Sequence, residues 1–393
     1  MLIAPNEEKM WEEQPITYKI SALDDYLYSD EELTTDYFKA QKRILTLRNR
    51  QQLPGFLRNL TNRNYIDLEL FTKIGYSWDV KKQSRFIESI LLNIPLPPII
   101  LFETGYRNYE LIDGKQRIVA IRDFYGDKYQ LTGLEFLTEF EGRIYDKLPI
   151  EFRSNLNNHY ISTVALLSES TFKVEEALHL KQITFERSNV NRLGLSKQKV
   201  RNCLYNGKFN ELLIELSSNS IFVTAWSTST NNTNGFSKKL DSLEFAELVL
   251  RFFALRHIQD ARTEIETFLD LYMIKSLKFS DEDIKILRHI FTETIKLAYK
   301  IYEDNLFKLY NLQSETWGHN ANQACYDAVM VGISKHLDAA ETLLNQKQEI
   351  IKETKKLFNQ ANSKLWENQD NKKADVQEII SLFDDMLSQV IVK

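Results

Sequence analysis

The spacing of apolar residues between 79 and 124 predicts two helices separated by two short strands. The first helix begins at an Asp79 N-cap and ends before Pro95. Its apolar face consists of Phe86, Ile87, Ile90, Leu91 and Ile94, with Arg85, Glu88 and Ser89 off that face. The runs 99–102 and 109–112 predict the strands. A turn at Asp113–Gly114 then leads into the second helix, which begins at Lys115 or Gln116.

The pattern becomes increasingly helical further along the chain. We expect a strand over 163–167, a helix over 175–185, and a helix that Ser196 caps and Gly207 ends. The Ser/Thr/Asn-rich segment 226–235 is the predicted linker. Apolar residues then recur every three or four positions over 282–302, and no proline follows Pro149. This predicts an all-α bundle of four to six helices over 236–393.

Composition limits the classes of protein that fit. A chain of 393 residues with 43% hydrophobic content favours two domains with substantial cores. The net charge of −5 argues against a generally basic coat for nucleic acid. Two cysteines are too few for a disulfide framework or a zinc cluster. With no apolar run of about 18 residues and an acidic N-terminus, we expect a soluble, cytoplasmic protein that does not enter a membrane.

The turn at Asp113–Gly114 has the chemistry of a phosphate site. A helix N-terminus carries unpaired backbone N–H groups and the positive end of the helix dipole. Gly114 permits close backbone approach, and Arg117 in the first turn can bind a phosphate bidentately. Asp113 is a candidate Mg²⁺ ligand. The alternative is that this is an ordinary strand-to-helix turn in which Asp113 is only an N-cap.

Positive charge gathers in one segment near the N-terminus. Between 37 and 66 there are no acidic residues. The basic residues are Lys39, Lys42, Arg43, Arg48, Arg50, Arg58 and Arg63. They are candidate DNA phosphate contacts, with Phe56 and Tyr65 as stacking residues. The alternative is a solvated basic helix that packs through Ile44, Leu45, Leu47 and Leu53.

Several motifs occur in an ordered series. They are SWDVKKQSRFIESILLNIPLPPIIL (77–101), YELIDGKQRIVAIRDFY (109–125), LTGLEFL (131–137), FERSN (185–189), LSKQKVRNCLYNGKFNELLIEL (195–216) and NANQACYDAVM (320–330). Together the motifs within residues 60–220 resemble the GmrSD-type restriction endonuclease N-terminal domain family. The resemblance implies a ParB/sulfiredoxin-like fold, so the expected class is α+β. The expected domains are an N-terminal extension with a basic helical segment (1–59), the DGKQR domain (60–225), a linker (226–235) and a helical domain (236–393).

The resemblance implies a nucleotide-binding component of a prokaryotic antiviral or restriction-type defence system that senses DNA. By position, the nucleoside triphosphate and its Mg²⁺ would lie at Asp113, Gly114, Lys115, Gln116 and Arg117. Lys73 and Arg85 are further candidate phosphate contacts. One departure weakens the expectation of hydrolysis, because Ile74 stands where the family usually has an arginine. If NTP hydrolysis occurs, Asp113, Gln116 and Glu88 are the candidate catalytic residues, for metal binding or water orientation.

Other functions remain open. The six histidines never form the His-Ile-x-Pro sequence of the nuclease fused to many relatives, so a separate nuclease is the expected partner. One alternative is that the chain is a DNA-binding protein whose nucleotide pocket is vestigial. Arg251 and His257 have the Arg-x5-His spacing that resembles HEPN ribonucleases, although the same segment suits a core helix. A structural adaptor built on the helical domain is a further alternative, and that domain can also support homo-oligomerisation.

Overall fold

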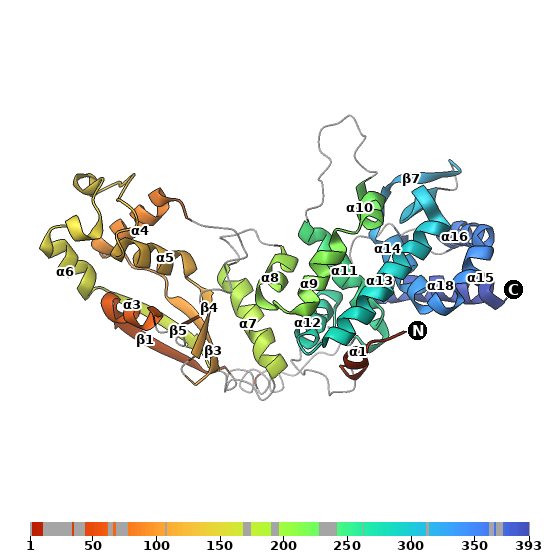
Figure 1. The fold of residues 1–393 in the computed structure, drawn as a ribbon, viewed down its shortest axis with the longest axis horizontal. Coiled ribbons are helices and arrows are strands. Elements are labelled where there is room, and N and C mark those ends of the chain that lie inside the picture. Colours follow the sequence, from red (N-terminus) through yellow and green to blue (C-terminus); the bar gives the residue numbers. More distant parts are fainter. Residues whose placement is uncertain are drawn as a thin grey trace. The chain divides into compact units, whose positions relative to one another are not determined.

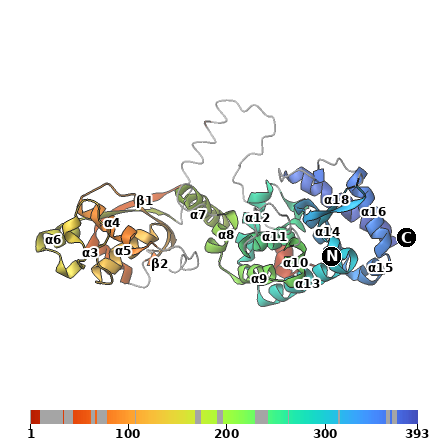
Figure 2. The same cartoon turned by 90° about the horizontal axis from the view of Figure 1, so that it is seen from above.

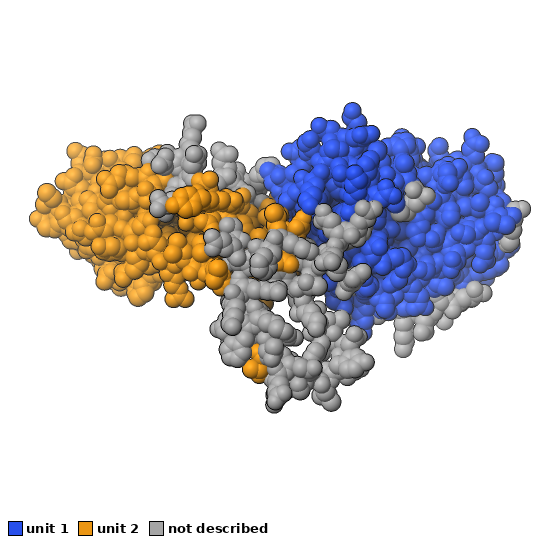
Figure 3. All heavy atoms as spheres, turned by 90° about the horizontal axis from the view of Figure 1, so that it is seen from below, with its two compact units in different colours: residues 1–24, 205–393 blue, residues 25–204 orange. Residues whose placement is uncertain are grey.

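The structure is a computed structural model that describes residues 2–10, 34, 44–61, 66–67, 78–106, 108–167, 174–189, 196–227, 242–261, 263–311, 314–360, 365–366 and 372–392. The chain forms two compact units (Figure 3). The sheet unit comprises Asp25–Leu204, and the helical unit comprises Met1–Asp24 together with Tyr205–Lys393. The fold is therefore mixed α and β, with a small sheet and many helices.

A five-stranded sheet in the order β1-β5-β3-β4-β2 forms the centre of the sheet unit. Its strands are β1 (Thr46–Gln52), β2 (Ile66–Asp67), β3 (Ile99–Gly105), β4 (Asn108–Asp113) and β5 (Tyr160–Leu166). β1 pairs with β5 and β3 with β4 in antiparallel fashion, whereas β3 with β5 and β2 with β4 are parallel. Figure 2 shows β1 and β2 at opposite edges.

The two faces of this sheet have different neighbours. The core lies on the face that carries Leu101, Leu111 and Ile161. That face packs against α3 (Leu53–Thr61), α4 (Val80–Leu91), α5 (Lys115–Tyr125) and α6 (Ile150–Asn158). Side chains alternate along a strand, so Glu110 projects from the opposite face. There it pairs with Lys181 of α7 (Val174–Asn189).

Capping residues and apolar spacing in the sequence correctly predicted α4, β3, β4 and α5. Asp79 is the N-cap of α4 and accepts a hydrogen bond from the Lys82 backbone N–H at 2.7 Å. The predicted strands are β3 and β4, and the predicted helix after the glycine turn is α5. Ser196 caps α8 (Lys197–Leu204) as expected, but Gly207 does not end that helix. Gly207 is instead the N-cap of the next helix, α9 (Lys208–Ser217).

The basic segment near the N-terminus is partly a strand, not the expected helix. All seven residues of β1 are paired with β5, and α3 begins only at Leu53. Ile44, Leu45 and Leu47 are 45%, 42% and 48% exposed, so they are not the buried stripe of a packed helix. β1 is an edge strand whose residues are mostly exposed, which leaves no clear apolar alternation in its sequence.

The helical unit departs from an all-α bundle. Its helices with described bounds are α1 (Pro5–Lys9), α9 (Lys208–Ser217), α10 (Ser220–Ser227), α11 (Ser242–Leu255), α12 (Ile265–Ser276), α13 (Asp281–Tyr302), α14 (Gln323–Lys335), α15 (Ala340–Asn345), α16 (Lys347–Gln360) and α18 (Lys373–Val392) (Figure 1). Seven of these described helices, α11 to α16 and α18, lie within 236–393, where four to six were expected. A hairpin of β6 (Lys308–Asn311) and β7 (Thr316–Ala321) adds strands that the helical periodicity did not predict.

The units also divide at a different place from the expected linker. The division falls at Leu204/Tyr205, because α9 and α10 pack against α11 and α13. Most of 226–235 lies outside the described residues. The expected N-terminal extension is itself split, since α1 belongs to the helical unit while β1 belongs to the sheet unit.

An acidic side chain fixes the N-terminal segment 2–10 within the helical unit. Glu7 is fully buried, and its Oε1 lies 2.9 Å from His257 Nε2 and 2.8 Å from the Tyr272 hydroxyl. Its Oε1 also lies 3.2 Å from Arg256 Nη1. Burial opposes ionisation, but Arg256, His257 and Tyr272 together lower the pKa of Glu7 to about 2. The segment is thus held by a buried charged network.

Candidate nucleotide and nucleic-acid sites

The glycine turn predicted from the sequence is present between β4 and α5. Gly114 is the N-cap of α5 and has a φ of 111°, in the region that favours glycine. A Cβ atom at this position would lie 2.4 Å from Ile99 Cδ1. Glycine is therefore required here by both backbone conformation and space. The helix N-terminus has no capping side chain from its own N-cap residue.

The side chain of Arg117 makes contacts within the sheet unit. Its side chain is 6% exposed, and Nη2 lies 2.9 Å from Asp113 Oδ2. Nη1 donates hydrogen bonds to the carbonyl oxygens of Pro97 and Pro98, the latter at 3.2 Å. The guanidinium therefore joins the first turn of α5 to the segment that enters β3. In this arrangement it is not directed at an external phosphate.

The neighbours of Arg117 are engaged as well. Asp113 pairs with Arg117 and does not act as the N-cap, which is Gly114. Gln116 Oε1 accepts a hydrogen bond from the Trp78 backbone N–H at 3.0 Å. Lys115, at the first helical position, is partly exposed. Lys73 and Ile74 lie outside the described residues.

Glu88 is a buried structural acceptor and not an exposed residue. It is 3% exposed, and its carboxylate accepts backbone N–H hydrogen bonds from Glu135, Phe136 and Leu137, the shortest at 2.7 Å. Burial opposes ionisation, but these three N–H groups lower the pKa of Glu88. The expected catalytic role is therefore not supported, because the carboxylate holds the 135–137 loop.

Arg85 is occupied on the surface near the same loop. Arg85 Nη2 lies 2.8 Å from Glu135 Oε1, and Arg85 Nε donates to the Gly133 carbonyl at 3.0 Å. Both charged side chains are about half exposed. Arg85 therefore helps α4 to hold the loop, and the structure does not bring it to the Gly114 turn.

Two of the predicted DNA contacts lie together on β1. Arg48 and Arg50 are exposed and, being two residues apart on a strand, project from the same face. Arg58 is in the last turn of α3. Lys39, Lys42, Arg43, Arg63 and Tyr65 lie outside the described residues.

The aromatic residue beside these arginines is not the one that the sequence indicated. Phe56 is fully buried in the core of the sheet unit, so it cannot stack on a base. Tyr160 of β5 is instead 47% exposed, and its ring centroid lies 5.4 Å from Arg50 Cζ. Strand pairing across more than 100 positions of sequence creates this contact, and only the strand register would have revealed it.

Arg251 and His257, whose spacing resembles a HEPN motif, are buried inside the helical unit. Arg251 Nη2 lies 2.7 Å from Asp327 Oδ2, and both side chains are buried. His257 contacts Glu7 and is 6% exposed. The two residues therefore serve separate buried networks, as the core-helix interpretation expected, and do not present a joint surface to RNA.

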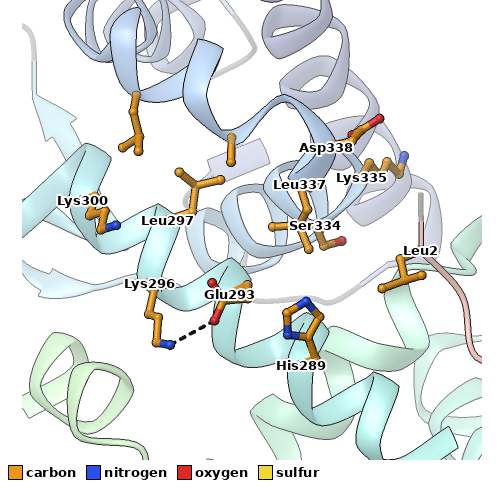
Figure 4. Close-up of a pocket in the computed structure, with 12 residues that line it drawn as sticks. Leu2, His289, Glu293, Lys296, Leu297, Lys300, Ser334, Lys335, Leu337 and Asp338 are labelled. Atoms are coloured by element: carbon orange, nitrogen blue, oxygen red, sulfur yellow. Dashed lines mark hydrogen bonds and ion pairs between the residues drawn. The ribbon is translucent and has the colours of Figure 1, made fainter.

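A groove of about 590 Å³ lies in the helical unit between α13 and the α14–α15 region (Figure 4). His289, Glu293, Lys296 and Lys300 of α13 form its polar wall. Glu293 and Lys296 pair with each other at 2.9 Å, and Leu297 and Leu337 add apolar surface.

Over the described part of the chain, no three His, Cys, Asp or Glu side chains are grouped to hold a metal ion. None of the described helices combines the length and apolarity needed to span a bilayer.

Comparison with known proteins gives one result. Residues 75–206 match the family model described as the GmrSD restriction endonuclease, N-terminal domain. No curated protein and no solved structure matches the chain. The matched range includes α4, the Gly114 turn, β5 and α8. Residues 75–206 of this chain therefore belong to the GmrSD restriction endonuclease N-terminal domain family.

Proposed function

We propose that the protein is a DNA-contacting component of a restriction-type defence system and that it acts with a separate nuclease. The family match supports the defence class. The observation that supports DNA contact is the exposed pair Arg48 and Arg50 on β1. The nuclease partner is proposed because the chain lacks the His-Ile-x-Pro sequence.

The charge around β1 suits a phosphate backbone. Residues 44–61 contain three arginines and no acidic residue, and the paired segment 159–167 contains no acidic residue either. This occurs in a chain whose net charge is −5, so the positive charge is a local feature. Contacts of this kind provide salt-sensitive affinity that does not depend on sequence.

Fluorescence anisotropy with labelled duplex DNA over about 50–200 mM salt tests the proposal. We expect the double variant Arg48→Gln/Arg50→Gln to weaken binding and to reduce the slope of log affinity against log salt by about 2, roughly 1 per phosphate contact. Arg122→Gln is the matched control, because Arg122 is an exposed arginine of α5 that pairs with Asp123. Absence of DNA binding, or an equal slope for wild type and the double variant, would contradict the proposal.

A second candidate function is nucleotide binding at the Gly114 turn. A strand that enters a helix through a positive-φ glycine at the N-cap position favours it. On this proposal the fold of the domain is ParB/sulfiredoxin-like, and the first-turn N–H groups with Lys115 hold the phosphates. Asp113 would hold Mg²⁺, and Gln116 would orient water if the triphosphate is hydrolysed. Arg117 would position the turn through Asp113 and Pro98.

The buried guanidinium of Arg117 favours the competing view that this pocket is vestigial. Calorimetric titration with ATP, GTP and CTP, with and without Mg²⁺, separates the two. Nucleotide binding predicts measurable heat and a loss of about tenfold in affinity for Lys115→Ala, equivalent to one charge-assisted contact. A vestigial pocket predicts no heat and DNA affinity that nucleotide leaves unchanged. Phosphate release measured with the same proteins decides whether hydrolysis occurs.

A further inference from the structure

We propose that the face of β1 and β5 around Tyr160 binds an unpaired DNA base, stacked on the tyrosine ring beside Arg50. This inference rests on the proposed DNA contact and specifies the kind of DNA that is recognised. The surface is defined by Arg48, Arg50, Tyr160 and Ser162, and we call it the Tyr160 face.

Strand register places these residues together. Arg50 is opposite Ser162 and Gln52 is opposite Tyr160 in the antiparallel β1–β5 pair, so Arg50 and Tyr160 are diagonal neighbours. Arg48 is opposite Val164, two positions further along the same face. The distance of 5.4 Å from Arg50 Cζ to the centroid of the Tyr160 ring agrees with this arrangement. The side chains belong to two strands that pair along their whole length, and not to a loop.

The Tyr160 face does not belong to the hydrophobic core. Ile161 and Ala165 of β5 project to the opposite face, where they join the core with α3 and α6. Tyr160 remains 47% exposed, and Arg48 and Arg50 are exposed on β1. The hydrophobic core therefore does not require an aromatic ring at this position, where Arg50 lies over the ring in a cation–π contact.

The chemistry of the face fits one particular partner. The two arginines supply positive charge, and neither strand contains a carboxylate to neutralise them. A phosphate backbone complements that charge, and an aromatic ring stacks on a base of any sequence. In a duplex the faces of the bases are covered by their neighbours, so a base reaches Tyr160 only when it is unpaired or extruded. One exposed ring in this cluster fits one base.

The experiment compares three DNA ligands by fluorescence anisotropy at fixed salt. They are a duplex, the same duplex with one bulged base, and the single strand. We expect wild type to prefer the bulged duplex and the single strand over the plain duplex. Tyr160→Thr, which retains a residue that favours strands, should lose roughly tenfold in affinity for those two ligands and keep its affinity for the plain duplex. Tyr160→Phe should bind like wild type because the ring is retained.

Tyr106→Thr is the matched control, since Tyr106 is 85% exposed elsewhere in the same unit. Thermal unfolding of all three variants checks that the strands are intact. Salt-sensitive duplex binding without preference for unpaired bases, or an equal loss for all ligands with Tyr160→Thr, overturns this inference and leaves the DNA-contact proposal standing. Absence of binding to every DNA ligand overturns both.

Discussion

The buried carboxylate of Glu7 provides the sharpest prediction about stability. We expect Glu7→Gln to destabilise the helical unit at neutral pH, because the substitution removes the negative charge beside Arg256 and His257. The side chain of Arg256 is fully buried, and it also donates a hydrogen bond to the Leu2 carbonyl oxygen. The variant therefore leaves a buried guanidinium without its carboxylate.

Two estimates of the magnitude agree. The pKa of Glu7 falls from 4.5 to about 2 on folding, and a shift of this size corresponds to about 3 kcal/mol of stability at neutral pH. Removing one partner of a buried ion pair costs about 3–5 kcal/mol. Because the pKa is lowered in the folded state, this stabilisation is fully present above pH 4.5 and is lost as the pH falls towards 2.

Scanning calorimetry of wild type and Glu7→Gln across pH 2–7 measures this difference. Glu8→Gln is the matched control, since Glu8 is the adjacent, exposed carboxylate on α1. Other carboxyl groups titrate equally in both proteins, so the difference between them isolates Glu7. The reasoning fails if Glu7→Gln is as stable as Glu8→Gln at pH 7. It also fails if the difference does not shrink on acidification.

Two further predictions concern the sheet unit and the interior of α14. Gly114→Ala should lower the free energy of unfolding by roughly 1–3 kcal/mol, because the residue has a positive φ and the added Cβ would contact Ile99 of β3. Gly55→Ala is the control: Gly55 lies in α3 with open space around it, so this substitution should raise the free energy of unfolding by up to about 1 kcal/mol. Equal melting temperatures would contradict this. Burial raises the pKa of Asp327 to about 6 although Arg251 opposes the shift. Its contribution to stability is therefore greatest below pH 3.8 and is lost as the pH rises through 6, so wild type should gain stability relative to Asp327→Asn on acidification from pH 7 to 4. If the difference in unfolding temperature between wild type and Asp327→Asn stayed constant from pH 7 to 4, the predicted direction of this pH dependence would be wrong.

Elements with strong local signals were predictable from the sequence. Asp79, the apolar stripe of α4 and the prolines after it define one helix, and Gly114 defines the start of the next. β1 was not predictable in this way, because an edge strand with mostly exposed residues carries no alternating pattern. Periodicity also missed the β6–β7 hairpin, which follows directly after the long helix α13.

The glycine turn was easier to predict from the sequence than the contacts of the side chains around it. The turn and its glycine are where the sequence placed them, but the side chain of Arg117 points inward. The spacing of Asp113 and Arg117, four residues apart across a helix start, was the available signal for their pairing. Glu88 was expected to lie off the buried face of its helix. Its role as a buried acceptor could not be predicted, because the N–H groups that it binds belong to a loop almost 50 residues later in the chain. Tyr160 was missed because only the strand register brings it to Arg50.

The position of α1 has a consequence for the order in which the protein assembles. The residues that hold Glu7 follow it by 249, 250 and 265 positions in the chain. During synthesis α1 leaves the ribosome before these partners, so it must wait until the entire sheet unit and α11–α12 have been made. Contacts of such long sequence separation form late, so the sheet unit can complete its own folding before the N-terminal segment docks.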